Sequence, residues 1–207
     1  MKRLLEGYWR FHNDMFPQRR DHFHLLSEGQ APETLFLTCA DSRVVPDLIL
    51  QTEPGDLFIG RNVGNVVPPH GAMEGGVSAT IEYAVEVLKV KHIIICGHSD
   101  CGAIKAALDK QSLASLPAAR HWLRYVESAW NFVDPSVRGS DTELLALIHA
   151  NVIAQVENLK THPEVSAALA QQRLEVHGWF YDILSGTIES YDLELKKFVP
   201  LGGSTAE

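Results

Sequence analysis

Two short segments of this sequence concentrate side chains that can bind a metal ion or act as nucleophiles. Residues 39–43 (Cys-Ala-Asp-Ser-Arg) and 97–102 (Gly-His-Ser-Asp-Cys-Gly) each follow an apolar run. Ligands of open parallel sheets bind beyond the carboxyl ends of the strands, so neighbouring strands would bring Cys39, His98 and Cys101 to one point. Two thiolates and an imidazole are good ligands for Zn²⁺. Three protein ligands leave a fourth position open, which is typical of a catalytic zinc site.

Other interpretations of these cysteines stay open at this point. A histidine and a cysteine separated by two residues, as in His-x-x-Cys, also occur by chance. A cysteine at a strand end often serves only as a small buried apolar residue of the core. Cys39 or Cys101 could instead be a catalytic thiol beside His98. The same two cysteines could also form a thiol-redox pair. Cys96 lies inside an apolar run, so we expect it in the core.

Asp41 and Arg43 are two positions apart, so on an extended segment their side chains point the same way and can pair. Two thiolates neutralise Zn²⁺ formally, so its bound water needs help to ionise. A carboxylate kept charged by an arginine can accept the hydrogen bond of the resulting hydroxide and orient it. One alternative is an ordinary surface salt bridge. Another is Asp41 as a fourth zinc ligand, which would make the protein a non-enzymatic structural zinc scaffold.

The elements that must position these residues follow a strand–helix–strand pattern. Short apolar runs bounded by turn residues predict buried strands. Between the second and third run, apolar residues recur at helical spacing, which predicts a parallel β-α-β unit. The expected strands are 34–38, 56–59, 92–96, 174–180 and 187–191, and the expected helices are 77–88, 102–109, 117–132 and 142–160. The predicted fold class is α/β: a mostly parallel central sheet flanked by helices, with an N-terminal helical arm and a C-terminal antiparallel hairpin.

Length and composition limit the possible classes of protein. The chain has 207 residues, 45% hydrophobic and 21% charged, which excludes disordered and fibrous designs. No long linker divides it, so we expect a single domain over 1–207, with residues 1–17 as an arm rich in aromatic residues. The net charge of −8 argues against nucleic-acid or membrane-surface binding. Three cysteines, no apolar run long enough to span a membrane and no secretory signal favour the cytoplasm.

Motifs spaced along nearly the whole chain resemble those of one known family. Residues 39–43 are similar to its Cys-x-Asp-Ser-Arg motif, and residues 98–101 to its His-x-x-Cys motif. Further matching segments are 53–58, 61–65, 81–84, 177–182 and 198–200. The family is the β class of carbonic anhydrases, and agreement of several motifs in the same order makes the resemblance specific.

The resemblance implies an activity and a cofactor. It implies one Zn²⁺ per subunit, bound by Cys39, His98 and Cys101, with Asp41 and Arg43 as the orienting pair. The implied reaction is the reversible hydration of CO2 to bicarbonate by a zinc-bound hydroxide. Because relatives hydrolyse carbon disulfide or carbonyl sulfide with similar chemistry, such a sulfur substrate is the alternative.

The resemblance also implies substrate-binding residues and an oligomer. Gln30 stands where a plant-like subgroup has a glutamine that donates a hydrogen bond to substrate. Phe58, Val63 and Tyr83 match an apolar pocket that the family builds partly across a dimer interface. We therefore expect a dimer or a dimer-based oligomer.

Two comparisons within the family refine this expectation. Phe36 replaces the Trp of a bicarbonate-inhibited bacterial subgroup, so we expect that regulatory site to be missing, although Arg61 and Tyr181 match its other positions. The stretch from residues 121–125 through 151–155 looks most like a bacterial form associated with cyanate metabolism.

Overall fold

The computed structural model describes residues 1–73, 75–109 and 111–202, so the last five residues of the expected domain lie outside the described residues. The chain divides into two compact units, Met1–Ala31 and Pro32–Glu207.

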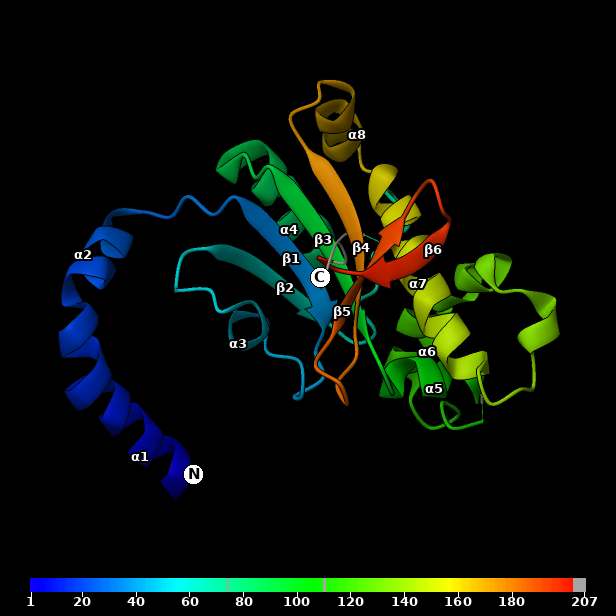
Figure 1. Cartoon of the computed structure of the whole chain (residues 1–207), viewed down its shortest axis with the longest axis horizontal. Helices are drawn as coiled ribbons and strands as arrows, with labels where there is room; N and C mark the ends of the chain where they lie inside the picture. The colour runs from blue at the N-terminus through cyan, green and yellow to red at the C-terminus, as the bar shows by residue number, and fades with distance from the viewer. Residues whose placement is uncertain (74, 110, 203–207) are drawn as a thin grey trace, which may run out of the picture. The chain divides into compact units, whose positions relative to one another are not determined.

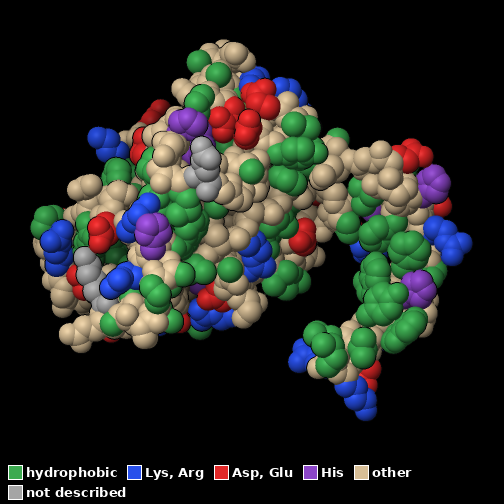
Figure 2. Space-filling model, turned by 180° about the vertical axis from the view of Figure 1, so that it is seen from behind, with side chains coloured by type: hydrophobic (Ala, Val, Ile, Leu, Met, Phe, Trp, Pro, Cys, Tyr) green, Lys and Arg blue, Asp and Glu red, His purple; other side chains and the backbone are tan. Residues whose placement is uncertain are grey.

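The first unit is helical, as expected for the arm. Its helices are α1 (Lys2–Arg10), the π-helical η1 (Phe11–Met15), the 3₁₀ helix η2 (Phe16–Arg19) and α2 (Arg20–Glu28). The expected boundary at residue 17 is wrong, because Pro17 lies in the first turn of η2, where its missing N–H interrupts no hydrogen bond and helix continues to Glu28. Figure 2 shows hydrophobic side chains gathered along this unit.

The second unit contains a six-stranded sheet in the order β2-β1-β3-β4-β5-β6 (Figure 1). Its strands are β1 (Thr34–Cys39), β2 (Leu57–Asn62), β3 (His92–His98), β4 (Glu175–Tyr181), β5 (Ile188–Asp192) and β6 (Lys197–Pro200). The pairings among β1, β2, β3 and β4 are parallel, whereas β5 pairs antiparallel with both β4 and β6. The predicted parallel sheet with an antiparallel hairpin is confirmed, and β6 extends the hairpin to a third strand.

Helices connect the strands, mostly where apolar periodicity predicts them. They are α3 (Pro46–Leu50), α4 (Gly76–Glu82), η3 (Tyr83–Leu88), α5 (Gly102–Leu108), α6 (Pro117–Leu123), η4 (Arg124–Phe132), η5 (Pro135–Val137), α7 (Glu143–Lys160) and α8 (Pro163–Ala170). The expected helix over 117–132 changes to 3₁₀ geometry at Arg124. Helices α3 and α8 are not predicted by the sequence pattern, because they are too short to show several apolar repeats. Among the described helices, none is long and apolar enough to cross a membrane.

Alternate residues of the central strands pack on opposite faces of the sheet. On one face, Leu37 and Ile95 pack in the same cluster as Val152 of α7. On the other face, Phe36 and Cys96 form a smaller cluster, in which the Phe36 ring meets Trp179 edge to face. The core position expected for Cys96 is confirmed, and burial raises the pKa of its thiol to about 12.

Candidate active site

The carboxyl ends of β1 and β3 place the three candidate metal ligands at one edge of the sheet. β1 and β3 are parallel neighbours with Thr38 opposite Cys96, so their last residues, Cys39 and His98, lie at the same edge of the sheet, one residue apart in register. Cys101 lies three residues after the end of β3, at the position that directly precedes α5. The strands run slightly further than expected, so Cys39 and His98 belong to the sheet and are held by its ladder.

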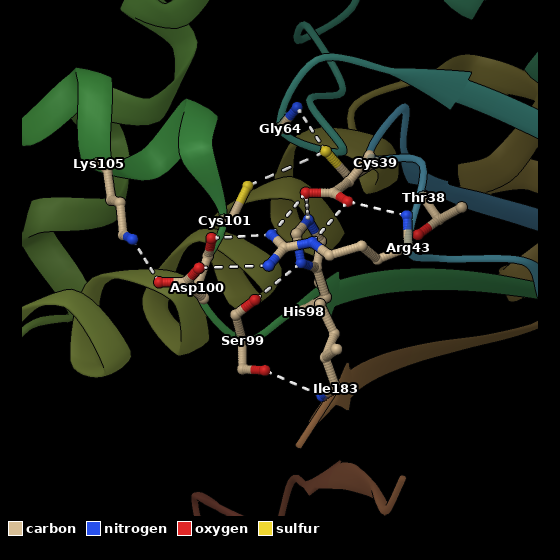
Figure 3. Close-up of polar contacts among 12 residues, drawn as sticks. Thr38, Cys39, Arg43, Gly64, His98, Ser99, Asp100, Cys101, Lys105 and Ile183 are labelled. Atoms are coloured by element: carbon tan, nitrogen blue, oxygen red, sulfur yellow. Dashed lines mark hydrogen bonds and ion pairs between the residues drawn. The ribbon is translucent and has the colours of Figure 1, made fainter. Parts of the chain in front are cut away.

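The geometry of these three side chains fits a metal ion. Their ligand atoms all lie within 4.8 Å of one another, and all three residues are buried. The Sγ atoms of Cys39 and Cys101 are 3.9 Å apart, close to the ~3.8 Å expected between two thiolates on a tetrahedral zinc ion. Figure 3 shows the two sulfur atoms facing each other.

His98 is oriented as a ligand and has no other partner for its second nitrogen. Its Nδ1–H donates to the carbonyl of Ser99 at 2.9 Å, which leaves the lone pair on Nε2. The ring is fully buried, yet Nε2 has no hydrogen-bond partner. A buried nitrogen without a partner is costly, and a metal ion at this position would remove that cost.

The sulfur atoms of Cys39 and Cys101 lie within hydrogen-bond distance of each other. The S–H of Cys101 donates to Cys39, and the N–H of Gly64 donates to the Cys39 sulfur at 3.4 Å, and both bonds lower the pKa of Cys39. The same bond to Cys39, together with burial, raises the pKa of Cys101. A divalent cation between the sulfurs would compensate the negative charges of two thiolates, so metal binding would be coupled to loss of the thiol protons.

Asp41 and Arg43 form the expected pair beside these ligands. Arg43 Nε donates to Asp41 Oδ1 at 3.0 Å and Nη2 donates to Oδ2 at 2.8 Å. These bonds hold the pKa of Asp41 well below its usual range, so the carboxylate stays ionised. Asp41 Oδ2 lies 3.8 Å from His98 Nε2, on the metal-facing side of the imidazole. A carboxylate here can accept a hydrogen bond from a water molecule at the metal position.

Asp100 is a further residue of the site, and its residue type and spacing alone predict no role for it. Arg43 Nη1 donates to Asp100 Oδ2 at 3.3 Å, Arg43 Nη2 donates to its carbonyl at 3.2 Å, and Lys105 forms an ion pair with it (Figure 3). Asp100 has a left-handed backbone with φ of 58°, which Asp tolerates better than most residues. An acidic residue directly before a ligand cysteine was the available signal, but only the fold brings it to Arg43.

Polar residues of α7 fix the loop that approaches Cys39. Asn151 Nδ2 donates to the carbonyl of Gly64 at 3.1 Å, and Gln155 Oε1 accepts from the N–H of Val67 at 2.8 Å. Gln155 Nε2 also donates to Asn151 Oδ1, so the two side chains form one buried network. The network holds the backbone whose Gly64 N–H contacts the Cys39 sulfur.

Of the expected substrate-binding residues in the second unit, Val63 directly precedes Gly64, whose N–H contacts the Cys39 sulfur, whereas Phe58 lies away from the candidate ligands. Phe58 lies opposite Leu35 in the sheet, four positions before Cys39 and thus about 13 Å away along the strand. Its ring contacts Tyr83 at 5.9 Å, and Tyr83 and Val63 are both about half exposed. Gln30 lies in the exposed segment after α2, in the first unit.

Comparison with known protein families gives a match over most of the chain. A family model described as carbonic anhydrase matches residues 34–188. The carbonic anhydrase of Pseudomonas aeruginosa is 48% identical over 202 residues, which cover 97% of this chain and 92% of that protein.

Solved structures give the same result. The β-carbonic anhydrase CcaA is 41% identical with a TM-score of 0.94, over 100% of this chain and 93% of that one. One of two tetrameric β-carbonic anhydrases from the filamentous ascomycete Sordaria macrospora is 35% identical with a TM-score of 0.74, over 91% of this chain and 92% of that one.

Proposed function

This chain belongs to the β class of the carbonic anhydrase family, and from that premise we propose that it hydrates CO2 reversibly to bicarbonate at a Zn²⁺ ion bound by Cys39, His98 and Cys101. The observation that carries the proposal is the buried, unpartnered Nε2 of His98 beside two sulfurs at tetrahedral spacing. When bound, zinc supplies an acidified water molecule and a Lewis acid for the oxygen that gains charge.

Asp41 and Arg43 provide orientation in this proposal. Both carboxylate oxygens of Asp41 accept hydrogen bonds from Arg43, which fixes the plane of the carboxylate and keeps it charged. Asp41 then accepts a hydrogen bond from the nucleophilic water, so that a lone pair of the water points toward CO2. Because Arg43 already engages both oxygens, Asp41 is better placed to orient water than to become a permanent fourth ligand.

The substrate pocket of the proposed enzyme requires a second subunit. The exposed side chains of Val63 and Tyr83, with Phe58 beside Tyr83, would complete an apolar wall across the interface of a dimer or dimer-based oligomer. Such a wall suits a small, uncharged, linear substrate. Gln30 would donate a hydrogen bond to the substrate oxygen, as in the plant-like subgroup.

The proposal also includes the branch of the family, the absence of a regulatory pocket and the location in the cell. Residues 121–125 and 151–155 support the bacterial form associated with cyanate metabolism, and Phe36 in place of Trp argues against a bicarbonate regulatory pocket. The three unpaired cysteines fit a cytoplasmic location.

Stopped-flow CO2 hydration, with zinc content measured on the same samples, tests the proposal. We expect Cys39→Ser to lose both zinc and activity, and the control Cys96→Ala, which removes a core thiol, to keep both. Full activity in a zinc-replete Cys39→Ser variant would refute the site. Faster release of sulfide from carbonyl sulfide than hydration of CO2 would assign the sulfur substrate instead.

A further inference from the structure

A second group of metal-ligating side chains lies at the opposite end of the sheet from the active site. His92 begins β3, and Glu175 begins the neighbouring strand β4 directly opposite it. His177 follows two positions after Glu175, so all three side chains project from the same face of the sheet. His92 and His98 stand at the two ends of β3, six positions or about 20 Å apart.

The three ligand atoms form a nearly equilateral triangle. His92 Nδ1 lies 3.3 Å from His177 Nε2 and 3.5 Å from Glu175 Oε2, and His177 Nε2 lies 3.6 Å from the same oxygen. Imidazole and carboxylate ligands of a tetrahedral zinc ion are separated by about 3.4 Å, because each bond is close to 2.1 Å long. The triangle therefore already has the size that one small divalent cation requires.

The chemistry of the group favours a cation over an ordinary salt bridge. Burial, and to a lesser degree the nearby His92, lowers the pKa of His177, which favours a neutral His177 imidazole with a lone pair available. The neighbouring Lys91 is engaged by Glu33, so it does not neutralise Glu175. The side chains of His92, Glu175 and His177 are 40%, 69% and 33% exposed, so an ion can enter from solvent.

We propose that His92, Glu175 and His177 form a second divalent-cation site, separate from the active site, for an ion such as Zn²⁺ or Ni²⁺ with at least one coordination position open to solvent or to another molecule. Two imidazoles and one carboxylate suit these ions, whereas Mg²⁺ and Ca²⁺ prefer oxygen ligands. The bound cation would join the first residues of β3 and β4 and stabilise the sheet.

Calorimetric titration of the zinc-loaded, full-length protein with Ni²⁺ tests this site. We expect one Ni²⁺ bound per chain, no displacement of the active-site zinc, and a higher melting temperature with Ni²⁺. His92→Ala and His177→Ala should each weaken Ni²⁺ binding at least about tenfold, since even outer partners of metal ligands contribute that much. His70→Ala, which removes an exposed histidine elsewhere in the same unit, should bind Ni²⁺ like the wild type.

Two results would overturn the proposal. One is the absence of Ni²⁺ binding to the zinc-loaded wild-type protein, and the other is undiminished binding by a His92→Ala/His177→Ala double variant. If the histidine variants do not fold, Ni²⁺ binding by Glu175→Gln tests the site instead. The Glu175 side chain is exposed, so it can lose its charge without loss of packing. Unchanged Ni²⁺ affinity in Glu175→Gln would then refute the site. Zinc content and CO2 hydration measured on the same samples report separately on the active site.

Discussion

Arg43 links the two acidic residues that border the metal ligands. Its planar guanidinium donates to both oxygens of Asp41 on one side and to the side chain and carbonyl of Asp100 on the other. Lysine cannot reproduce this arrangement, because an ammonium group lacks the rigid fork of donors. Arg43 thus fixes the orientation of the carboxylate that faces the metal position, and Asp100 fixes Arg43.

For the single residue Asp41, we predict that the Asp41→Asn variant keeps its zinc but has a kcat/KM lower by a factor on the order of 10². This is the usual cost of removing one well-placed polar group from a reaction site. The amide retains the shape of the side chain, but it is neutral and presents only one acceptor oxygen. Stopped-flow hydration with zinc analysis measures the effect, and Asp47→Asn, an exposed aspartate after β1, is the control. A zinc-loaded Asp41→Asn enzyme as active as the wild type would remove Asp41 from the mechanism.

Among the elements, α7 approaches the sheet closely because two glycines leave room for it. A Cβ added at Gly97 would lie 2.7 Å from Val152 Cγ2, and one added at Gly178 would lie 3.0 Å from Val152 Cγ1. Gly97 directly precedes His98, so the packing of α7 also sets the position of that ligand.

We therefore predict that Gly97→Ala lowers the free energy of unfolding by about 1–3 kcal/mol, the typical cost of overpacking a core. The free energy of unfolding of the Gly97→Ala/Val152→Ala double variant should fall by less than the sum of the two single effects. Alanine at position 152 removes the methyl groups that would clash with the added Cβ. Urea unfolding of the four proteins measures this. If the effects of the two single variants on the free energy of unfolding are strictly additive, residues 97 and 152 are not in close contact.

His149 of α7 is packed against the C-terminal strands. Its ring stacks on Phe198 at 4.2 Å and meets Phe180 edge to face at 4.5 Å. Burial lowers the pKa of His149 from 6.5 to about 4, so the neutral ring is the form that packs.

This burial predicts a pH dependence of stability. Between pH 6.5 and about 4 the unfolded chain holds a proton on His149 that the folded chain does not, so stability falls as the pH falls through that window. The full effect is at most about 3 kcal/mol. His149→Phe keeps the aromatic packing and should show a shallower loss of stability, measured by urea unfolding at pH 7 and pH 4.5. Equal losses in both proteins would show that His149 does not contribute.

The sequence predicted the elements that have strong local signals. Apolar runs and turn residues located β1, β3 and the β4–β5 hairpin, and the spacing of reactive residues located Cys39, His98 and Cys101. The short helices α3 and α8 have too few repeats for such a signal. Contacts between distant segments, such as Asp100 with Arg43 or His92 with Glu175 and His177, depend on strand order and register, which local patterns do not encode.

For the whole molecule, exposed apolar surface supports the proposal that the protein assembles into an oligomer. Large apolar side chains of the first unit, including Leu4, Leu5, Tyr8 and Trp9, are each more than half exposed. In the second unit, Val63 and Tyr83 are also exposed. Apolar surface of this extent is typical of association sites. In the proposed closed oligomer of identical subunits, this surface would lie between subunits.

We predict that a Leu5→Glu/Trp9→Glu double variant dissociates toward smaller species and loses activity while each chain still folds. Charged residues placed in an apolar interface lose their hydration without gaining a partner. Sedimentation velocity together with CO2 hydration measures both effects, and Leu184→Glu, at an exposed turn between β4 and β5, is the control. An active wild-type monomer would contradict the shared pocket.

The most direct test of the account is stepwise reconstitution of the metal-free protein with Zn²⁺. Hydration of CO2 is followed by stopped flow at each step, in the His92→Ala/His177→Ala background so that only the active site takes up the ion. The account predicts that activity rises in proportion to bound zinc and reaches its maximum at one ion per chain. Activity in the metal-free protein, or full occupancy of the site by zinc without CO2 hydration, would contradict it.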